Sequence, residues 1–362
     1  MNKNVKIIVP FFIIFVVLYV IIAARQLSPE IHFVPAWTVD LESYTKEENP
    51  APSLEDFKGA ISFKLAQNLG YFSEDGKILS YITFPYKATV SPNAYAVYGT
   101  SSEKIAIISP DGSQVGTINR TGFPYFSEDR KFIFLPGGSS FSKISDDGNE
   151  EWTYEGFSPI TAFSSSKTGI VAGFADGTVT AFDNEGNITQ KYSPGGSNSE
   201  IILGAAISEN SRFIATLSGQ DSQRFVIAKK TDASYGSHTS IAFYKTMEKE
   251  LNRQVLIKFS RDEKKVFYNS AKGIGIVSCT NFRNTEIPIE GRILSILESE
   301  SGDEIFVLSK DKNKYTVSTI ESFDAFSGSF SFEADSACIA VKGEALFIGR
   351  DGKISRMDII HR

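Results

Sequence analysis

The sequence predicts an all-β protein that is made of repeated small sheets and preceded by one apolar N-terminal helix. Three observations predict this organisation. Residues 7–24 form an unbroken uncharged run, IIVPFFIIFVVLYVIIAA. From about residue 57 onward, short strand-like runs are separated by turn residues, with no convincing long amphipathic helix. Within that region, similar turns recur at a spacing near 37 residues.

The uncharged run at residues 7–24 is long enough to cross a membrane as a helix. Its 18 residues would span roughly 27 Å, against about 30 Å for the hydrocarbon core of a bilayer. Lys3 and Lys6 precede the run, so the positive-inside rule places residues 1–6 in the cytoplasm and the remainder outside. The alternative is a cleaved signal peptide, but this run is long for one, and bulky Ile22 would lie at the −3 position of a cut after Ala24. We therefore expect an uncleaved signal-anchor helix in a single-pass membrane protein, whose main domain lies in the bacterial periplasm or at the cell surface.

Residues 25–56 are predicted to form an extended linker. The segment combines prolines with acidic residues, and both oppose a packed core. These residues are Pro29, Pro35, Pro50 and Pro52, with Glu30, Asp40, Glu42, Glu47, Glu48, Glu55 and Asp56. Trp37 and Tyr44 could contact a partner or the chain's own domain, and we expect them to dock on the domain.

Composition narrows the class of partner and the compartment. The formal net charge of −6 argues against a surface for nucleic acid or anionic lipid, since both require basic patches. The two cysteines, Cys279 and Cys338, are expected to be isolated buried thiols, although a disulfide between them stays open. So few cysteines in a large exported domain favour a bacterial envelope over a eukaryotic secretory route.

One turn recurs in register along the chain. Ser109-Pro110-Asp111-Gly112, Ser145-Asp146-Asp147-Gly148 and Asp183-Asn184-Glu185-Gly186 each place glycine fourth. This pattern predicts a type I turn followed by a left-handed glycine, which closes a hairpin. The three glycines are 36 and 38 residues apart.

Two further units repeat. One is an apolar residue and serine followed by acidic or polar residues, at Phe72-Ser73-Glu74-Asp75, Phe126-Ser127-Glu128-Asp129, Ile207-Ser208-Glu209-Asn210 and Phe259-Ser260-Arg261-Asp262. The other is a tight Asp-Gly hairpin between strand-like runs, in VAGFADGTVTAFD (171–183) and LFIGRDGKISRMD (346–358).

Four short strands per repeat, at a period of about 35–45 residues, are typical of a β-propeller. A β-sandwich is the alternative, but it does not explain a fixed period. We expect residues 57–362 to form a propeller, most simply of seven four-stranded blades. The predicted blades are 88–120, 123–155, 160–192, 201–247, 254–288, 291–321 and 325–360. Since the last supplies three strands, strands from 57–84, such as Ile78–Phe84, are expected to close the ring. Eight blades stay open because the unit at Phe72 resembles the start of a blade.

The segment WTYEGFSPITAFSSSKTGIVAGFADGTVTAFDNEGN (152–187) resembles the repeat of the quinoprotein-like (PQQ-type) and WD40-like propellers. The resemblance is partial over 88–155 and weak over 201–330. It implies the fold and no particular activity, because such propellers host both enzymes and scaffolds. A functional analogue is the periplasmic propeller lipoprotein of the outer-membrane assembly machinery. This chain differs from it in having an apolar N-terminal run and no lipid-attachment cysteine.

The sequence offers no constellation that supports catalysis. His32, His238 and His361 are scattered, so clustered imidazole ligands and an activating base for a serine nucleophile are both unsupported. The adjacent cysteine pair of the quinone-dependent dehydrogenases is absent, and Gly137-Gly138 and Gly195-Gly196 are turn glycines. The Asp-rich turns lack the glutamate of a calcium loop. We therefore predict no catalytic, cofactor-binding or metal-binding residues, no cofactor and no enzyme activity.

One irregularity points to a possible partner surface. Ile207 and Phe259 are 52 residues apart, whereas the equivalent Phe126 and Phe163 are 37 apart. The excess includes Thr231–Thr239 and Lys245–Arg253, and insertions in propellers lie in loops where partners bind. A tolerated surface insertion is the alternative.

The predicted function is a non-catalytic, membrane-anchored scaffold for an envelope protein partner. A sensor of a small ligand or glycan in the propeller channel is the alternative. A propeller enzyme, either a hydrolase or a quinone- or metal-dependent dehydrogenase, is a further alternative.

Overall fold

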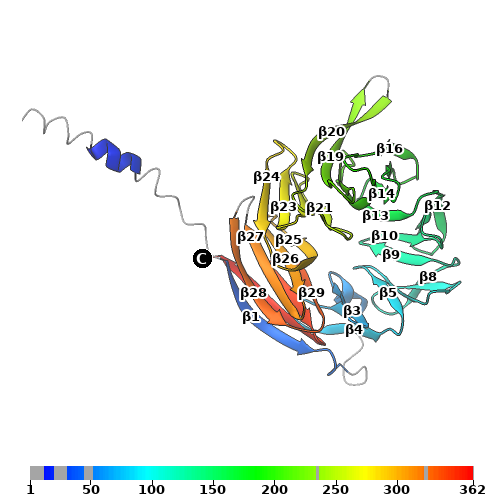
Figure 1. The fold of residues 1–362 in the computed structure, drawn as a ribbon. Helices are drawn as coiled ribbons and strands as arrows, with labels where there is room; N and C mark the ends of the chain where they lie inside the picture. The colour runs from blue at the N-terminus through cyan, green and yellow to red at the C-terminus, as the bar shows by residue number, and fades with distance from the viewer. Residues whose placement is uncertain (1–11, 20–30, 45–51, 234–235, 322–324, 362) are drawn as a thin grey trace, which may run out of the picture.

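The computed structural model describes residues 12–19, 31–44, 52–233, 236–321 and 325–361. Within these residues the strands form eight antiparallel sheets, seven of four strands and one of three, arranged as blades around a central axis (Figure 1). The predicted propeller is therefore confirmed. The predicted number of seven blades is wrong, and the eight-bladed alternative is the one observed.

Blades 1–4 follow the chain from the first sheet after the 3₁₀ turn Leu54–Phe57. Their strands are β2 (Ile61–Leu65), β3 (Asn68–Phe72) and β4 (Ile78–Thr83) in blade 1; β5 (Lys87–Val90), β6 (Tyr95–Tyr98), β7 (Ile105–Ile108) and β8 (Gln114–Ile118) in blade 2; β9 (Phe123–Ser127), β10 (Arg130–Phe134), β11 (Phe141–Ile144) and β12 (Glu150–Tyr154) in blade 3; and β13 (Ile160–Ser165), β14 (Ile170–Phe174), β15 (Val179–Phe182) and β16 (Ile188–Tyr192) in blade 4.

Blades 5–8 contain several longer strands. They are β17 (Ile202–Ile207), β18 (Phe213–Ser218), β19 (Arg224–Ala233) and β20 (Gly236–Thr246) in blade 5; β21 (Ile257–Phe259), β22 (Lys265–Asn269), β23 (Gly273–Ser278) and β24 (Asn284–Pro288) in blade 6; β25 (Arg292–Glu298), β26 (Glu304–Asp311), β27 (Lys314–Glu321) and β28 (Ala325–Glu333) in blade 7; and β29 (Ala337–Lys342), β30 (Ala345–Arg350), β31 (Lys353–His361) and β1 (Ile31–Asp40) in blade 8.

The ring is closed by β1, which pairs with β31 from Ile31↔His361 to Asp40↔Lys353. Two predictions fail here: residues 57–84 are not the closing strands, and residues 31–40 are not an extended stalk. Pro35 and the acidic residues suggested a linker, but β1 is the outer strand of its sheet, where proline is tolerated. The register shifts between Pro35 and Trp37, so a bulge absorbs the irregularity.

The extra blade comes from residues for which the sequence predicts other roles. Residues 61–83 form the three-stranded blade 1, rather than donating a strand to the last blade. The strand β28, which was expected to begin the last blade, pairs with β27 along its length and completes blade 7. The predicted blades between residues 88 and 288 match blades 2–6.

The strand order gives the disc two distinct faces. In each complete blade from 2 to 7 the first strand in the sequence lies at one edge of the sheet and the fourth at the other. Connections between the first and second and between the third and fourth strands therefore lie on one face. We call this the terminal face, because β1 begins there and β31 ends there. The opposite face, the crossover face, carries the connections between the second and third strands and from each blade to the next.

The recurring turns have the predicted geometry. Gly112, Gly148 and Gly186 have φ values of 87°, 93° and 87°, in the left-handed region that favours glycine. The N–H of Gly112 donates to the carbonyl oxygen of Ser109 at 2.9 Å, and Gly148 and Gly186 make the equivalent bonds. The turn motif is thus explained by hairpin closure on the terminal face.

Part of the second repeated unit ties neighbouring blades together. On the terminal face, carboxylates of one blade accept hydrogen bonds from backbone N–H groups of the blade before it. These bonds are Lys167 N to Glu209 Oε2 at 2.9 Å, Asn210 N to Glu263 Oε1 at 2.6 Å and Arg261 N to Glu298 Oε2 at 2.8 Å. They join blades 4, 5, 6 and 7 in sequence.

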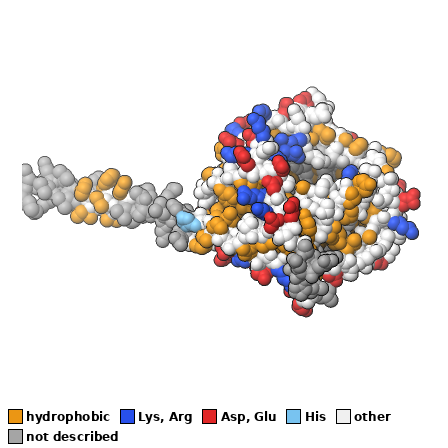
Figure 2. Space-filling model, turned by 90° about the horizontal axis from the view of Figure 1, so that it is seen from below, with side chains coloured by type: hydrophobic (Ala, Val, Ile, Leu, Met, Phe, Trp, Pro, Cys, Tyr) orange, Lys and Arg blue, Asp and Glu red, His pale blue; other side chains and the backbone are white. Residues whose placement is uncertain are grey.

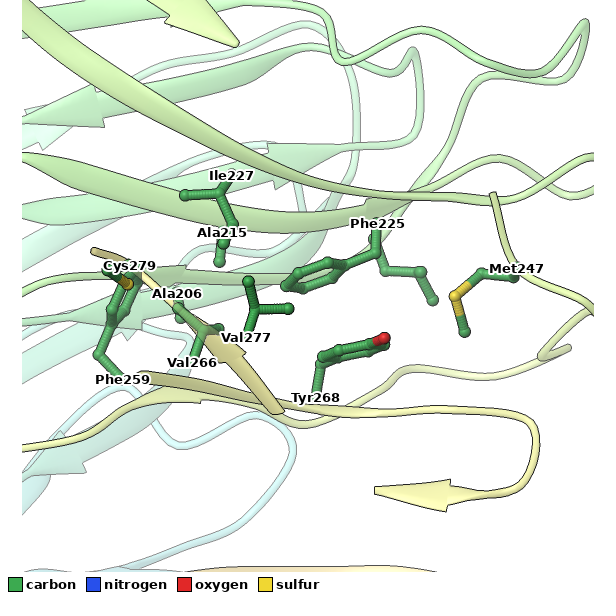
Figure 3. Close-up of a cluster of buried hydrophobic side chains, with 11 residues drawn as sticks. Ala206, Ala215, Phe225, Ile227, Met247, Phe259, Val266, Tyr268, Val277 and Cys279 are labelled. Atoms are coloured by element: carbon green, nitrogen blue, oxygen red, sulfur yellow. The ribbon is translucent and has the colours of Figure 1, made fainter. Parts of the chain in front are cut away.

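Several hydrophobic clusters lie between adjacent blades, because a four-stranded sheet cannot bury both of its faces alone. Figure 3 shows the cluster between blades 5 and 6, in which Phe225 of β19 stacks on Tyr268 of β22. Their ring centroids are 4.0 Å apart and the rings are nearly parallel, at 13°. Trp37 packs in the same way between blades 8 and 1, against Phe72 and Phe347. The prediction that Trp37 and Tyr44 dock on the chain's own domain is confirmed.

Residues 12–19 of the apolar run are helical, and the rest of the run at 7–24 lies outside the described residues. Among the described residues, no helix combines the length and the apolar character needed to span a membrane.

Candidate functional site

The first part of the predicted insertion lengthens a hairpin. The strands β19 and β20 form a ladder that extends to Ala233↔Gly236, and Figure 1 shows this hairpin projecting beyond its neighbours. Ile241 and Tyr244 of β20 are 48% and 61% exposed. The side chains of residues 232–238, which include His238, are outside the description. This part of the insertion is on the surface, as expected.

The second part of the insertion turns inward. After β20 the chain crosses to the inner strands of blades 4 and 5, where the N–H of Val255 donates to the carbonyl oxygen of Leu203 at 3.0 Å. The amide of Gln254 donates to the carbonyl oxygen of Thr161 at 2.7 Å. Gln223 and Leu251 exchange two hydrogen bonds, of 2.8 and 2.7 Å. These hydrogen bonds fix residues 251–255 against the inner strands, where they form part of the channel wall. The sequence did not indicate this position.

Gly204 makes this course possible. A Cβ atom at this position would lie 2.5 Å from Cγ2 of Val255 and 2.9 Å from its carbonyl oxygen. No side chain fits there without moving the loop. The glycine therefore allows the loop at Val255 to lie directly on β17.

The loop at residues 251–255 borders a cavity of about 460 Å³. The cavity is lined by residues of the first strands of blades 3, 4, 5, 6 and 7, so it lies at the central channel. Its lining includes Tyr125, Phe163, Leu203, Arg253, Arg292 and Leu294. Most of its lining lies where these strands begin, and this places its opening on the crossover face.

The electrostatic character of this channel cavity is cationic. Arg253 and Arg292 line it, and the described lining residues contain no Asp or Glu. Deeper along the inner strands, the Lys258 ammonium donates to the carbonyl oxygen of Ile296 at 3.3 Å. Solvent reaches Lys258, but the surrounding protein atoms partly desolvate its ammonium, and this lowers its pKa.

Exposed aromatic side chains lie on this face, in blades 1–4 and their connections. Tyr86 and Phe157 lie in connections between blades; Tyr86 is 71% exposed and Phe157 is fully exposed. Phe123 begins β9, and the ammonium of Lys87 lies 4.9 Å from its ring centroid. Tyr125, which is partly exposed, lines the channel cavity itself.

A second cavity, of about 710 Å³, lies on the terminal face between blades 7 and 8. Its charged lining residues are Glu300, Asp303, Glu304, Glu321, Glu344 and His361. Glu304 is nearly buried, and one of its carboxylate oxygens lies 3.4 Å from Nε2 of His361. This terminal-face cavity is thus acidic. On the side of the molecule shown in Figure 2, by contrast, basic and acidic side chains are interspersed.

Comparison with known proteins agrees with the ring of blades. A family described as "beta-propeller protein" matches residues 1–362. The chain belongs to the β-propeller protein family. An uncharacterized protein of Treponema pallidum (strain Nichols) is 27% identical over 355 residues, which cover 97% of this chain and 93% of the relative.

Solved structures share the propeller fold at low sequence identity. BamB from Moraxella catarrhalis matches with a TM-score of 0.57 and 11% identity, covering 90% of this chain and 100% of BamB. A chain in the crystal structure of the mitotic checkpoint complex matches with a TM-score of 0.53 and 13% identity, covering 93% of this chain and 98% of that one. At these identities the likeness concerns the fold alone.

The residues considered at the sequence level for chemistry lie apart in the propeller. Cys279 and Cys338 are free thiols in blades 6 and 8, and burial raises their pKa values to about 12 and about 11. His32 and His361 lie on the paired strands β1 and β31. Within the described ranges, no group of three or more His, Cys, Asp or Glu side chains is arranged to hold a metal ion.

Proposed function

We propose that this β-propeller protein is a non-catalytic scaffold that binds a protein partner in the cell envelope, held at the membrane by residues 7–24. The observation that carries the proposal is the register of β1 on β31. Because Ile31 pairs with His361, the chain reaches the propeller at the terminal face. The crossover face, with its exposed aromatic side chains, is then directed away from the anchor.

The length of the connecting segment supports this orientation. Six residues, 25–30, separate the apolar run from β1. Even a fully extended segment of that length reaches only about 20 Å. The terminal face would therefore stay close to the bilayer surface, while the crossover face points toward partners.

The side chains of the crossover face suit a protein partner. Aromatic residues and arginine are the types enriched in protein interfaces, where a few of them supply most of the binding energy. Tyr86 and Phe157 are large side chains that lie exposed to solvent and do not belong to the buried core. A propeller chain within a structure entitled mitotic checkpoint complex is consistent with partner binding by this fold.

The finer relationship to PQQ-type and WD40-like propellers rests on residues 152–187, and the envelope location rests on the apolar run and on the fold shared with BamB. The absence of catalytic activity is likewise part of the proposal, since the sequence shows no nucleophile–base pair.

Site-specific photocrosslinking in intact cells tests the scaffold. A photoreactive residue placed at Tyr86 or at Phe157 should yield an adduct with the same protein, whereas placement at Glu185 or Glu300 on the terminal face should not. Phe157→Ser should remove at least nine-tenths of the adduct formed at Tyr86, and Glu185→Ser should leave it unchanged. Adducts confined to the terminal-face positions, or none at either crossover position, would overturn the proposal.

A further inference from the structure

We propose that the channel cavity on the crossover face binds an acidic peptide segment of the protein partner, with its carboxylates paired to Arg253 and Arg292. This inference rests on the proposed scaffold function and names the chemistry of the partner. It follows from the charge of the cavity, from the way its loop is held and from its size.

The charge of the cavity runs against that of the whole chain. The protein carries 43 acidic and 37 basic residues apart from histidine, yet the described lining of the channel cavity holds two arginines and no carboxylate. A concave site of one sign surrounded by low-dielectric protein concentrates ligands of the opposite sign. The site therefore selects an anionic ligand.

These two arginines have no structural partner among the described residues. Several other basic side chains of the propeller are held in ion pairs, such as Lys245 with Glu286 at 2.5 Å and Arg356 with Asp358 at 2.6 Å. No ion pair or hydrogen bond links the guanidinium group of Arg253 or of Arg292 to a described residue. A guanidinium offers a planar set of donors that matches a carboxylate, so both side chains are available to bind one.

The position of Arg253 is fixed by the loop that carries it. The hydrogen bonds of Leu251, Gln254 and Val255 to blades 4 and 5 hold the backbone on both sides of this residue. Arg292 begins β25 on the far side of blade 6, so the pair approaches the cavity from two separate elements. Backbone that is already ordered lowers the entropy lost on binding.

The size and the remaining walls favour a peptide over an isolated ion. A volume of about 460 Å³ lies within the range that holds an organic ligand. Tyr125, Phe163, Leu203 and Leu294 give the cavity apolar walls beside the arginines. The exposed aromatic residues Tyr86 and Phe157 lie on the same face, so a protein segment in the cavity could continue onto them.

The test uses the full-length protein in detergent micelles and fluorescently labelled peptides. One peptide carries six consecutive glutamates, and its match carries six glutamines. We expect the glutamate peptide to bind at least tenfold more tightly, with an affinity that falls as NaCl is raised from 50 to 300 mM. Over this range of salt concentration, the screening of exposed charges increases strongly.

Paired variants locate the binding. The double variant R253Q/R292Q should weaken the glutamate peptide at least tenfold. K104Q/K249Q removes the same charge from the crossover face outside the cavity and should change affinity less than twofold. R253K/R292K keeps the charge but loses the planar donor set, and its affinity should fall between those of the other two. Thermal denaturation should show that all three fold like the parent.

Four results would overturn the inference. The first two are equal binding of the two peptides and an R253Q/R292Q variant that binds the glutamate peptide like the parent. The third is a K104Q/K249Q variant that weakens binding as much as R253Q/R292Q does. The fourth is displacement of the peptide by citrate or inorganic phosphate at the concentration at which the peptide half-saturates the protein. The last would assign the cavity to a small anion. Since these measurements need no partner, peptide binding without crosslinking at Tyr86 or Phe157 would reject the scaffold function alone, and crosslinking without peptide binding would reject this inference alone.

Discussion

The terminal-face cavity and the channel cavity lie on opposite faces and carry opposite charge. The terminal-face cavity is lined by five carboxylate side chains and His361, and it is built from the ends of blades 7 and 8. The channel cavity is lined by Arg253 and Arg292 and is built from inner strands and the inward loop of blade 5. Two of the acidic side chains have partners within the fold, Glu304 beside His361 and Glu321 accepting a hydrogen bond from the Ser327 hydroxyl. Neither arginine side chain has a partner among the described residues.

Acidic residues on the terminal face commonly hold turns or join blades. The carboxylates of Asp111 and Asp147 accept hydrogen bonds within their own hairpins, and that of Glu298 accepts a bond from the N–H of Arg261 in blade 6. The arginines of the channel cavity make no comparable bond with a described residue. A charged side chain that has no partner in the fold is the better indicator of a binding site. This favours the crossover face as the binding face.

Removing β1 is expected to have the largest effect on stability, because it opens the ring on which both faces depend. A chain that begins at residue 52 loses the whole pairing from Ile31↔His361 to Asp40↔Lys353, together with the packing of Trp37. We expect a loss of about 5–10 kcal/mol, comparable with the full stability of an ordinary domain. Chemical denaturation should show no cooperative transition.

A chain that begins at residue 28 is the control for this truncation. It lacks the apolar run but keeps β1, so it should unfold cooperatively at the denaturant concentration of the full-length protein. Equal stability of the two truncated chains would mean that β1 does not close the ring.

The second largest effect is expected at Gly204, and it should disturb only the channel cavity. Gly204→Ala places a Cβ atom 2.5 Å from Val255, so the loop must move away from β17. We expect a loss of about 1–3 kcal/mol, typical of overpacking, and weaker binding of the acidic peptide.

Gly328→Ala is the matched control for this position. A Cβ atom there meets nothing within 4 Å, and it should leave stability within about 0.5 kcal/mol and peptide binding unchanged. A Gly204→Ala protein with parental stability and parental binding would show that the loop does not need its contact with β17.

Blades 2–6 could be predicted from the sequence because their signals are local. The turn at Ser109–Gly112 and its repeats carry their own hydrogen bonds, so each predicts a hairpin without knowledge of the rest of the chain. Closure by β1 was missed because its partner β31 lies more than 300 residues away. Its proline and acidic residues also suggest a linker unless the strand is known to be at an edge.

The channel cavity could not be predicted for a related reason. Arg253 and Arg292 are 39 residues apart, and only the ring places both at one opening. The insertion was recognised from its length, but the inward course of Gln254 and Val255 depends on backbone acceptors in blades 4 and 5. Gly204 was the one local signal, since a glycine within a strand marks a close approach of another backbone.

The next effect concerns pH and tests the structural role of terminal-face carboxylates. Hydrogen bonds from the Ser109 and Ser145 hydroxyls, followed by bonds from nearby backbone N–H groups, lower the pKa values of Asp111 and Asp147 below the ordinary 3.8. A carboxyl whose pKa is lowered by folding stabilises the protein above its unfolded pKa, and this contribution is lost as pH falls through the folded value.

We therefore expect the melting temperature to fall between pH 6 and pH 3, and to fall less in the double variant D111N/D147N. Thermal denaturation followed by circular dichroism at both pH values measures the two slopes. E185Q/D303N removes two other terminal-face carboxyls, whose side chains accept no hydrogen bond from a described residue, and it should keep the parental slope. Identical slopes in the parent and in D111N/D147N would mean that these two turn carboxylates do not cause the loss of stability in acid.

The smallest effect is expected from Lys87, whose ammonium lies 4.9 Å from the ring centroid of Phe123 on the crossover face. At an exposed site such a cation–π contact contributes about 0.5–1 kcal/mol. Lys87→Met keeps an unbranched side chain but removes the charge, so it should lower stability by about that amount while leaving the acidic peptide bound, since Lys87 does not line the channel cavity. Urea denaturation and the peptide titration measure the two outcomes on the same protein, with Lys104→Met as the control on that face. A tenfold loss of peptide affinity in Lys87→Met alone would mean that the anionic segment is held at the rim by Lys87, and the contrast between the two faces would then depend on surface charge and no longer on the channel cavity.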